Sequence, residues 1–489
     1  MLGLEPKRIK ARIHTAGFSF SALLVLILSS VLLIVVTQRA WTPVYLGPTG
    51  HNAQRFTELL IYTLFALLFF GKKLRFKVER LLSNNKIETL LVAGIFFSML
   101  FSTISSEYTY KSFQEVGRVA GMVLMILAIS TFPSSELKSW IWLPFITLSV
   151  LLSLHFLMIY LVAFEYPEVL FGKPMIDGFS HVRSFNHLQV FLIPILFFTC
   201  VKFKSKSFFL FLIIFFLLVS QWVLLFYTKG RGVFLALILG YVVSSLFCEK
   251  EQKKTSNIVF LISVGVGFLL YWIPFSWVPE NILHVDVKDY IDRFDYGSPR
   301  RIYLWKVGFE AFSQNPLLGL GGQAFVVADG EATEGSAHNF YINFLAEYGG
   351  VAAALLLFLC VRALKSIGLN WRKDSRLLNY IWCFPLFSAV IYSFVTGIML
   401  SPMSSILMAL FLGVAIGSMC DQKSTFMNVA AEERSISGLI LVVFLAGMFL
   451  IGIIFTLADV VYSLKDLSSC IGETICYPRF WLNGNISSF

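Results

Sequence analysis

Long apolar segments dominate the chain and follow one another with short polar connections between them. A helix needs roughly 20 mostly apolar residues to cross a bilayer, so this pattern predicts an all-α integral membrane fold, a polytopic bundle of about 12–13 transmembrane helices. Two of the segments are short, which leaves the choice between twelve and thirteen open. The predicted spans lie near residues 15–36, 56–71, 88–104, 114–132, 139–163, 188–201, 208–227, 232–247, 257–276, 339–361, 377–397, 402–419 and 436–458.

The connections between these spans differ in charge from one side to the other. The basic start of the chain precedes an apolar run without a small-x-small cleavage site, so the first run is interpreted as a span with a cytoplasmic N-terminus. Alternating the spans from there places the Lys- and Arg-rich connections in the cytoplasm, as the positive-inside rule requires. Residues 1–489 are therefore predicted to form a single polytopic domain, with a large external loop at 277–338 and a short external C-terminal tail at 459–489.

Composition supports a membrane protein and argues against other classes. The chain is 57% hydrophobic and 14% charged, whereas soluble proteins have about 25% charged residues, and its mean hydropathy is +0.77. The excess of 39 basic over 29 acidic residues is explained by cytoplasmic loops, because no basic soluble domain is visible and no nucleic-acid partner is expected. The chain also lacks an evident internal repeat of the kind common in transporters.

Arginines gather at the predicted external membrane edge. Arg183 precedes the sixth span, Arg231 and Lys229 lie in the short turn YTKGRG, and Arg300 and Arg301 open an aromatic-rich helical stretch. Guanidinium groups bind phosphate and pyrophosphate bidentately, so their convergence predicts a site for such an anion. The alternative for each arginine is an interfacial anchor whose side chain extends towards water.

A polar stripe opens the span that begins near residue 339. If Ser336 caps this helix, the histidine lies in its first turn, where a neutral imidazole can accept a proton or a hydrogen bond from an incoming hydroxyl. A carboxylate inside a span is costly, which favours a functional role, and the Gly-Gly pair that follows predicts close helix packing. The alternative is a helix-capping polar cluster that faces other helices. The stripe consists of His338, Asn339, Asn343 and Glu347.

Other patterns in the sequence are weaker evidence for a functional site. The glycine-rich sequence NPLLGLGGQAF at 315–325 has no Rossmann or P-loop context, so nucleotide binding is not expected. Cys470 and Cys476 lie in the external tail, where an oxidising compartment would allow them to pair, and two further zinc ligands are lacking. A row of aspartates is compatible with calcium or magnesium but more typical of a solvated helical face. It comprises Asp286, Asp289, Asp292 and Asp295.

Three of these motifs resemble those of the bacterial O-antigen ligase superfamily, and they follow one another along the chain as they do in that superfamily. The superfamily includes WaaL-type ligases, O-antigen polymerases and protein O-oligosaccharyltransferases. HNFYINFLAEYGG at 338–350 is similar to a His-Asn signature followed by Glu-x-Gly. YTKGRG at 227–232 is similar to a Ser/Thr-x-x-Arg-Gly/Ala turn, and residues 300–325 resemble the Arg-x-x-x-Trp…Asn-Pro stretch that precedes the histidine. The resemblance covers roughly residues 180–420.

This resemblance implies a GT-C type glycosyltransferase of the bacterial inner membrane, with its active site at the periplasmic face and no metal or cofactor. The donor would be a glycan on undecaprenyl pyrophosphate, transferred with inversion. Arg183, Arg231 and either Arg301 or Arg300 would hold the pyrophosphate, and His338 would orient or deprotonate the acceptor hydroxyl. The supporting polar residues would be Asn339, Asn343, Glu347 and Lys229.

The acceptor decides the activity. Lipid A–core would define an O-antigen ligase, which we favour, whereas a growing glycan chain would define a polymerase and a protein Ser or Thr an O-oligosaccharyltransferase. A lipid-linked oligosaccharide flippase is the alternative of another class, but it predicts charge at the midplane and pseudo-repeats. One departure stands out: ligases of the family have twelve spans with both ends inside, whereas a thirteenth span is predicted here.

Overall fold

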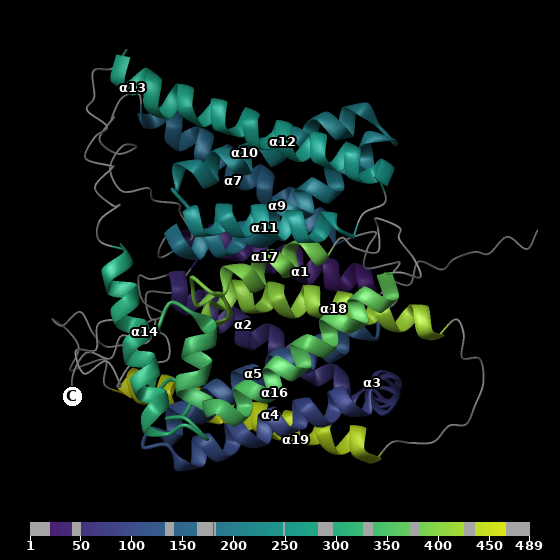
Figure 1. The fold of residues 1–489 in the computed structure, drawn as a ribbon, viewed down its shortest axis with the longest axis vertical. Coiled ribbons are helices and arrows are strands. Elements are labelled where there is room, and N and C mark those ends of the chain that lie inside the picture. The colour runs from purple at the N-terminus through teal and green to yellow at the C-terminus, as the bar shows by residue number, and fades with distance from the viewer. Residues whose placement is uncertain are drawn as a thin grey trace, which may run out of the picture.

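The computed structural model describes residues 20–41, 50–132, 141–163, 179, 182–247, 250–281, 297–325, 336–371, 382–424 and 436–465, and among them every regular element is a helix (Figure 1). The predicted all-α fold is confirmed. The first group of helices is α1 (Phe20–Trp41), α2 (Gly50–Leu67), η2 (Leu68–Phe70), α3 (Lys72–Asn84), α4 (Lys86–Ser105), α5 (Thr109–Ser130), α7 (Trp142–Ala163) and α9 (Val182–Lys204). They are followed by α10 (Phe208–Tyr227), α11 (Arg231–Ser245), α12 (Lys250–Trp272), η3 (Ile273–Trp277), α13 (Val278–Asn281), α14 (Gly297–Gln314), α16 (Phe340–Trp371), α17 (Cys383–Tyr392), η6 (Ile398–Leu400), α18 (Pro402–Ser424) and α19 (Ile436–Lys465).

Each predicted span coincides with one of these helices. Within the described residues, 8 helices are long and apolar enough to cross a membrane, and shorter apolar helices lie in α1, α7, α11 and α17. The remaining predicted span is α2, whose first turns carry Gln54, Arg55 and Glu58. These polar residues lower its hydropathy, and their partners are described below.

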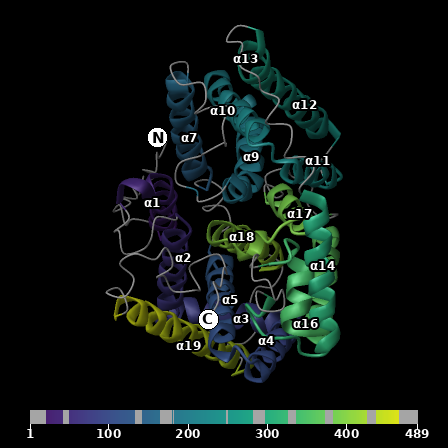
Figure 2. The same cartoon turned by 90° about the vertical axis from the view of Figure 1, so that its left-hand side faces the viewer.

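Three helices lie at the centre of the bundle and are covered by the others (Figure 2). The buried share of the apolar window is 89% in α9, 83% in α18 and 72% in α5, against 28% in α12 and α16. Small residues permit the closest contacts between helices, as expected in a membrane. A Cβ at Gly117 of α5 would lie only 2.6 Å from the Cα of Gly452 in α19, so these two helices touch through their backbones.

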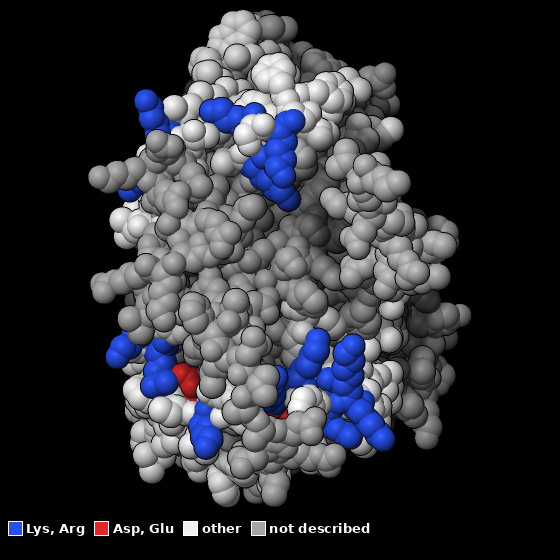
Figure 3. Space-filling model, turned by 90° about the vertical axis from the view of Figure 1, so that its right-hand side faces the viewer, with Lys and Arg blue, Asp and Glu red and all other residues white. Residues whose placement is uncertain are grey.

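The two ends of the bundle carry different elements. In Figure 1, α14 and α13 lie at the left-hand ends of the long helices and α3 lies at the right, so we call these the α14 end and the α3 end. Lys and Arg gather on the face at the α3 end (Figure 3). They include basic residues of α3 and, in the last turn of α9, Lys202 and Lys204. These connections, which the sequence predicts to be cytoplasmic, therefore share one end.

The helix α16 is interrupted at Gly349, which adopts φ 72° and ψ −177°. In an uninterrupted helix the carbonyl groups of Ala346 and Glu347 would accept hydrogen bonds from the N–H groups of Gly350 and Val351. The interruption removes both bonds and exposes four backbone groups, which cannot remain unpaired inside an apolar bundle.

The glycine-rich loop at 315–321 pairs all four of these groups. The N–H groups of Leu320 and Gly321 donate to the carbonyls of Ala346 and Glu347 at 3.0 and 2.8 Å. In return, Gly350 N–H donates to the Pro316 carbonyl at 2.8 Å, and Val351 N–H to the Leu317 carbonyl at 3.4 Å. We call this arrangement the loop clamp. The Gly-Gly pair therefore permits close packing in a different way from that predicted: Gly349 breaks the helix and the loop packs there, with Phe312 of α14 beside Gly350.

Substituting Gly349 with Ala is expected to lower stability by about 1–3 kcal/mol, because a non-glycine residue is strained at positive φ. The added Cβ would also collide with the Leu317 carbonyl oxygen. Gly447→Ala in α19 is the matched control, since a Cβ there meets nothing within 4 Å and a helical Ala is favoured over Gly. The measurement is the thermal unfolding midpoint of each purified variant in detergent. Equal midpoints for the two variants would contradict the loop clamp.

Candidate active site

Four helices bring the predicted site residues to the α14 end. Arg183 lies in the first turn of α9, Arg231 is the first residue of α11, Arg301 lies in α14, and His338 directly precedes α16. Arg183 Nη1 and His338 Nε2 are 3.2 Å apart, although 155 residues separate them in the sequence. Because a guanidinium carries only donors, the imidazole Nε2 must be the acceptor in this contact.

Arg301 completes a pair of neighbouring guanidinium groups. Its side chain is half-buried, and its pKa is lowered, first by burial and then by the positive charge of Arg183. Two cations held close enough to repel each other form a site that a bound anion would stabilise. Arg301 therefore lies near Arg183, as the predicted anion site requires. The backbone of Arg300 belongs to α14, and its side chain lies outside the described residues.

The turn that carries Arg231 is anchored to α9 one turn below Arg183. Thr228 Oγ1 donates to the Oδ1 of the buried Asn186 at 2.8 Å, and Gly230 packs against the Asn186 amide. Lys229 adopts a φ of 50°, which turns the chain sharply into α11. Arg231 is exposed on the first residue of that helix and Lys229 is half-buried. The predicted grouping of this turn with the Arg183 region is thus observed.

The local geometry of His338 differs from the prediction. The helix begins at Phe340, and Asn339 is its N-cap: Asn339 Oδ1 accepts from the N–H groups of Tyr341 and Ile342 at 3.0 and 3.2 Å. Ser336 is therefore not the cap; its hydroxyl accepts the His338 N–H at 3.4 Å. His338 lies outside the first turn with a φ of 48°, a left-handed conformation that directs the chain away from the helix axis.

The residues on both sides of His338 are fixed to the end of α17 and to α16. Asn339 Nδ2 donates to the Phe394 carbonyl at 2.9 Å, and Phe340 N–H donates to the Ser393 carbonyl at the same distance. The Ala337 N–H donates to Asn343 Oδ1 at 3.3 Å. The backbone around His338 is thus held by defined hydrogen bonds while its ring faces Arg183.

Glu347 and Asn343 lie in the first two turns of α16, next to the segment that carries His338. Both side chains are buried, and the Glu347 carboxylate lies near the Asn343 side chain and the backbone of Gln323 and Phe325. The predicted polar stripe is therefore continuous from Glu347 to Asn343. It attaches the end of the loop clamp to the segment that carries His338.

The sequence interpretation did not identify a buried ion network between α2 and α5. Arg118 pairs with Glu115 through both its Nε and Nη2 atoms, and its Nη1 lies 3.1 Å from Glu58. Glu58 also pairs with Arg55 at 2.5 Å. All four side chains are buried. The available signal was two Arg/Glu pairs at i,i+3 spacing, within or beside predicted spans, where ionisable residues are rare.

This ion network braces two segments that flank His338. Arg55 Nη2 donates to the Leu400 carbonyl at 2.8 Å and Arg118 Nη1 to the Met399 carbonyl at 3.4 Å, which holds η6. Glu115 lies near the Gln323 side chain, just beyond the loop clamp. The ion network, the loop clamp and the start of α16 therefore form one connected polar structure.

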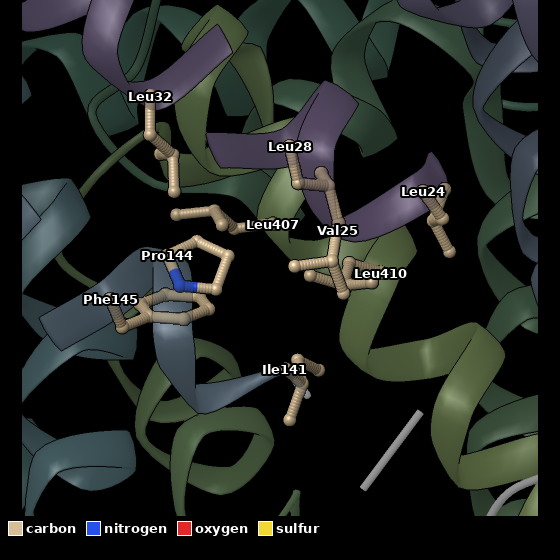
Figure 4. A pocket seen from close by; sticks show the side chains of 9 residues that line it. All are labelled: Leu24, Val25, Leu28, Leu32, Ile141, Pro144, Phe145, Leu407 and Leu410. Carbon is tan, nitrogen blue, oxygen red and sulfur yellow. The ribbon is translucent and has the colours of Figure 1, made fainter. Parts of the chain in front are cut away.

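A small cavity elsewhere in the bundle has no part in this arrangement. Its lining side chains come from α1, from α7 with the preceding Ile141, and from α18, and all of them are apolar, among them Leu28, Phe145 and Leu407 (Figure 4). It contains no group that could bind an anion.

Within the described residues, no cluster of three or more His, Cys, Asp or Glu side chains could hold a metal ion. The aspartate row at 286–295 and the proposed Cys470–Cys476 pair lie outside the described residues. The absence of a metal requirement therefore stays a prediction.

Comparison with known proteins supports the predicted family resemblance. Residues 212–357 match the family described as O-antigen ligase, a range that contains Arg231, Arg301, His338 and Glu347, while Arg183 precedes it. The match covers less than a third of the chain and supports its resemblance to the superfamily of O-antigen ligases and polymerases, whose members are glycosyltransferase-like. A search of curated proteins found no match.

Arg118→Met is expected to destabilise the protein by about 3–5 kcal/mol, because it leaves Glu58 and Glu115 buried without their shared partner. Arg362→Met is the matched control. It removes the Arg362–Glu88 pair between α16 and α4, 2.7 Å apart and partly exposed, which is worth about 0–1 kcal/mol. The thermal unfolding midpoints of the two variants in detergent provide the comparison. A shift for Arg118→Met no larger than that for Arg362→Met would contradict the bracing role.

Proposed function

We propose that this protein is an O-antigen ligase that transfers a polysaccharide from undecaprenyl pyrophosphate to lipid A–core. One observation carries the proposal: Arg183, Arg301 and His338 converge from three separate elements at one end of the bundle. Two guanidinium groups beside an imidazole supply charge for a pyrophosphate and an acceptor for a hydroxyl proton.

The orientation belongs to the same proposal. The α14 end faces the periplasm and the α3 end faces the cytoplasm of the bacterial inner membrane. One observation supports this: Lys and Arg gather at the α3 end (Figure 3). The positive-inside rule assigns such an end to the cytoplasm. The large loop at 277–338 and the tail at 459–489 are then periplasmic. Nucleotide sugars are confined to the cytoplasm, so a lipid-linked donor is the substrate that reaches this end.

The chemistry requires positive charge more than acid catalysis. The acceptor hydroxyl oxygen forms a bond to the anomeric carbon from the face opposite the phosphate, and the bond from that carbon to the phosphate oxygen breaks with inversion. Arg183, Arg231 and Arg301 stabilise the charge that develops on the departing pyrophosphate. His338 orients the acceptor hydroxyl or takes its proton.

Arg183 then has two successive partners. In the structure it donates to His338 Nε2, the atom that would receive the acceptor proton. A pyrophosphate binds a guanidinium more strongly than a neutral imidazole does, since both partners are charged. Donor binding would therefore draw Arg183 away and leave Nε2 free for the acceptor.

A polymerase or a protein O-oligosaccharyltransferase would use the same donor residues and differ only in the acceptor. No described contact favours either over the ligase. The flippase alternative gains no support, because the buried charges of α2 and α5 are paired with one another and the remaining candidate charges lie at one end.

His338→Ala is expected to abolish glycan transfer in a strain that lacks the native gene, because it removes the imidazole that contacts Arg183. The measurement is the lipopolysaccharide pattern on a gel, together with the level of lipid-linked glycan. His155→Ala in α7 is the matched control, with expression verified for both variants.

Each outcome identifies one activity. Loss of the polymeric ladder with accumulation of full-length lipid-linked glycan supports the ligase. Cores with a single repeat would indicate a polymerase, and unchanged lipopolysaccharide with an unglycosylated pilin would indicate the protein transferase. Normal transfer by His338→Ala would overturn the role of His338 itself.

A further inference from the structure

We propose that α3 is an interfacial helix whose exposed basic side binds the phosphate-bearing headgroups of anionic phospholipids. This helix lies at the end of the bundle opposite α14 (Figure 1), so its role is independent of the proposed function. The positive-inside rule explains positive charge at this end. It does not explain the exposed aromatic residues that accompany the charge on and beside α3.

Both ends of α3 are joined to neighbouring helices by a single residue. Gly71 alone separates η2 from α3, and Asn85 alone separates α3 from α4. The helix α4 is a candidate membrane span, and η2 continues directly from the predicted span α2. In Figure 1 α3 is seen nearly end-on while the long helices run across the picture, so α3 lies crosswise to them. It therefore lies where the spans end, at the depth of the lipid headgroups.

The exposed side of α3 carries positive charge without compensation by acidic residues. Glu79 is the one acidic residue in the sequence of α3, and it is buried and lies 3.8 Å from Arg75. Basic residues next to the membrane surface attract anionic lipids, and an ammonium or guanidinium group is a natural partner for a lipid phosphate. The exposed basic residues of α3 are Lys72, Lys73, Lys77 and Arg80.

The other side of α3 is packed against the bundle, which holds the basic side in a fixed position. Val78 and Leu82 belong to the hydrophobic core, and a Cβ at Gly438 of α19 would lie 3.3 Å from the Cα of Glu79. Lys77 Nζ also donates to the carbonyl of Thr131, directly after α5, at 3.3 Å. Because the helix is already ordered, a headgroup that binds it does not have to pay for folding it.

Two exposed phenylalanines favour a lipid over a soluble acidic partner. Phe70, the last residue of η2, is 82% exposed, and Phe76 of α3 is 42% exposed. Phe76 follows Lys72 by four residues, so the ring and the ammonium group share one side of the helix. Aromatic and basic side chains on one surface helix are typical of a helix in the membrane interface, where the rings enter the acyl-chain boundary and the charges contact headgroups.

The test is a titration of the full-length protein, purified in a neutral detergent, with phosphatidylglycerol. Lys72→Gln/Lys73→Gln is expected to raise the Kd about 25-fold, since each basic residue near an anionic membrane surface contributes about fivefold to binding. Lys253→Gln/Lys254→Gln is the matched control. It removes an adjacent lysine pair from the start of α12, on the far side of the bundle from α3 (Figures 1 and 2), and should leave the Kd within about twofold because salt screens distant charges.

A charge-preserving variant and two reference ligands decide between the explanations. Lys72→Arg/Lys73→Arg should bind phosphatidylglycerol as the wild type does, whereas phosphatidylcholine, which has no net charge, and soluble glycerol phosphate, which has no acyl chains, should bind much more weakly. Equal losses in the two glutamine variants, a loss in the arginine variant, or equal affinity for either reference ligand would overturn the proposal. A wild-type protein that does not bind phosphatidylglycerol would also overturn it, and would leave a soluble acidic partner for this surface.

Discussion

The structure depends on the requirement that backbone polar groups inside an apolar bundle be paired. Gly349 breaks α16 in the interior, and the loop clamp at 315–321 supplies the partners that the broken helix lacks. Because α14 ends at Gln314, directly before this loop, the clamp also fixes the helix that carries Arg301. The same short region of α16 continues towards His338 through Asn343. One local break thus sets the relative positions of an arginine and the histidine of the candidate site.

The buried charges have a corresponding structural role. Arg55 and Arg118 each form an ion pair and donate to a carbonyl of η6, and Glu115 reaches the loop clamp through Gln323. Removing any one partner would leave an uncompensated charge in a low-dielectric interior. Breaking the ion network is therefore energetically unfavourable. The two segments beside His338 that contact it are held in place as a result. The candidate site is therefore supported by buried charge.

Much of this arrangement could be predicted from sequence because apolar length and loop charge determine which residues share one side of a membrane. That reasoning grouped Arg183, Arg231, Arg301 and His338 correctly at one end. It could not determine their local geometry. Asn339 caps α16 instead of Ser336 because the cap depends on a left-handed turn at His338. The residue pattern does not predict that turn. The pairing of Glu58 with Arg118 joins helices 60 residues apart, and sequence shows only the i,i+3 halves of that network.

The most direct test of the central claim is the reaction of the purified protein, reconstituted in vesicles, with undecaprenyl-pyrophosphate-linked polysaccharide and lipid A–core. Arginines around a departing pyrophosphate predict that free undecaprenyl pyrophosphate is released in step with glycosylated lipid A–core, and that the new linkage has the inverted anomeric configuration. A donor that remains intact, or that crosses the vesicle bilayer without cleavage of its sugar–phosphate bond, would contradict the account.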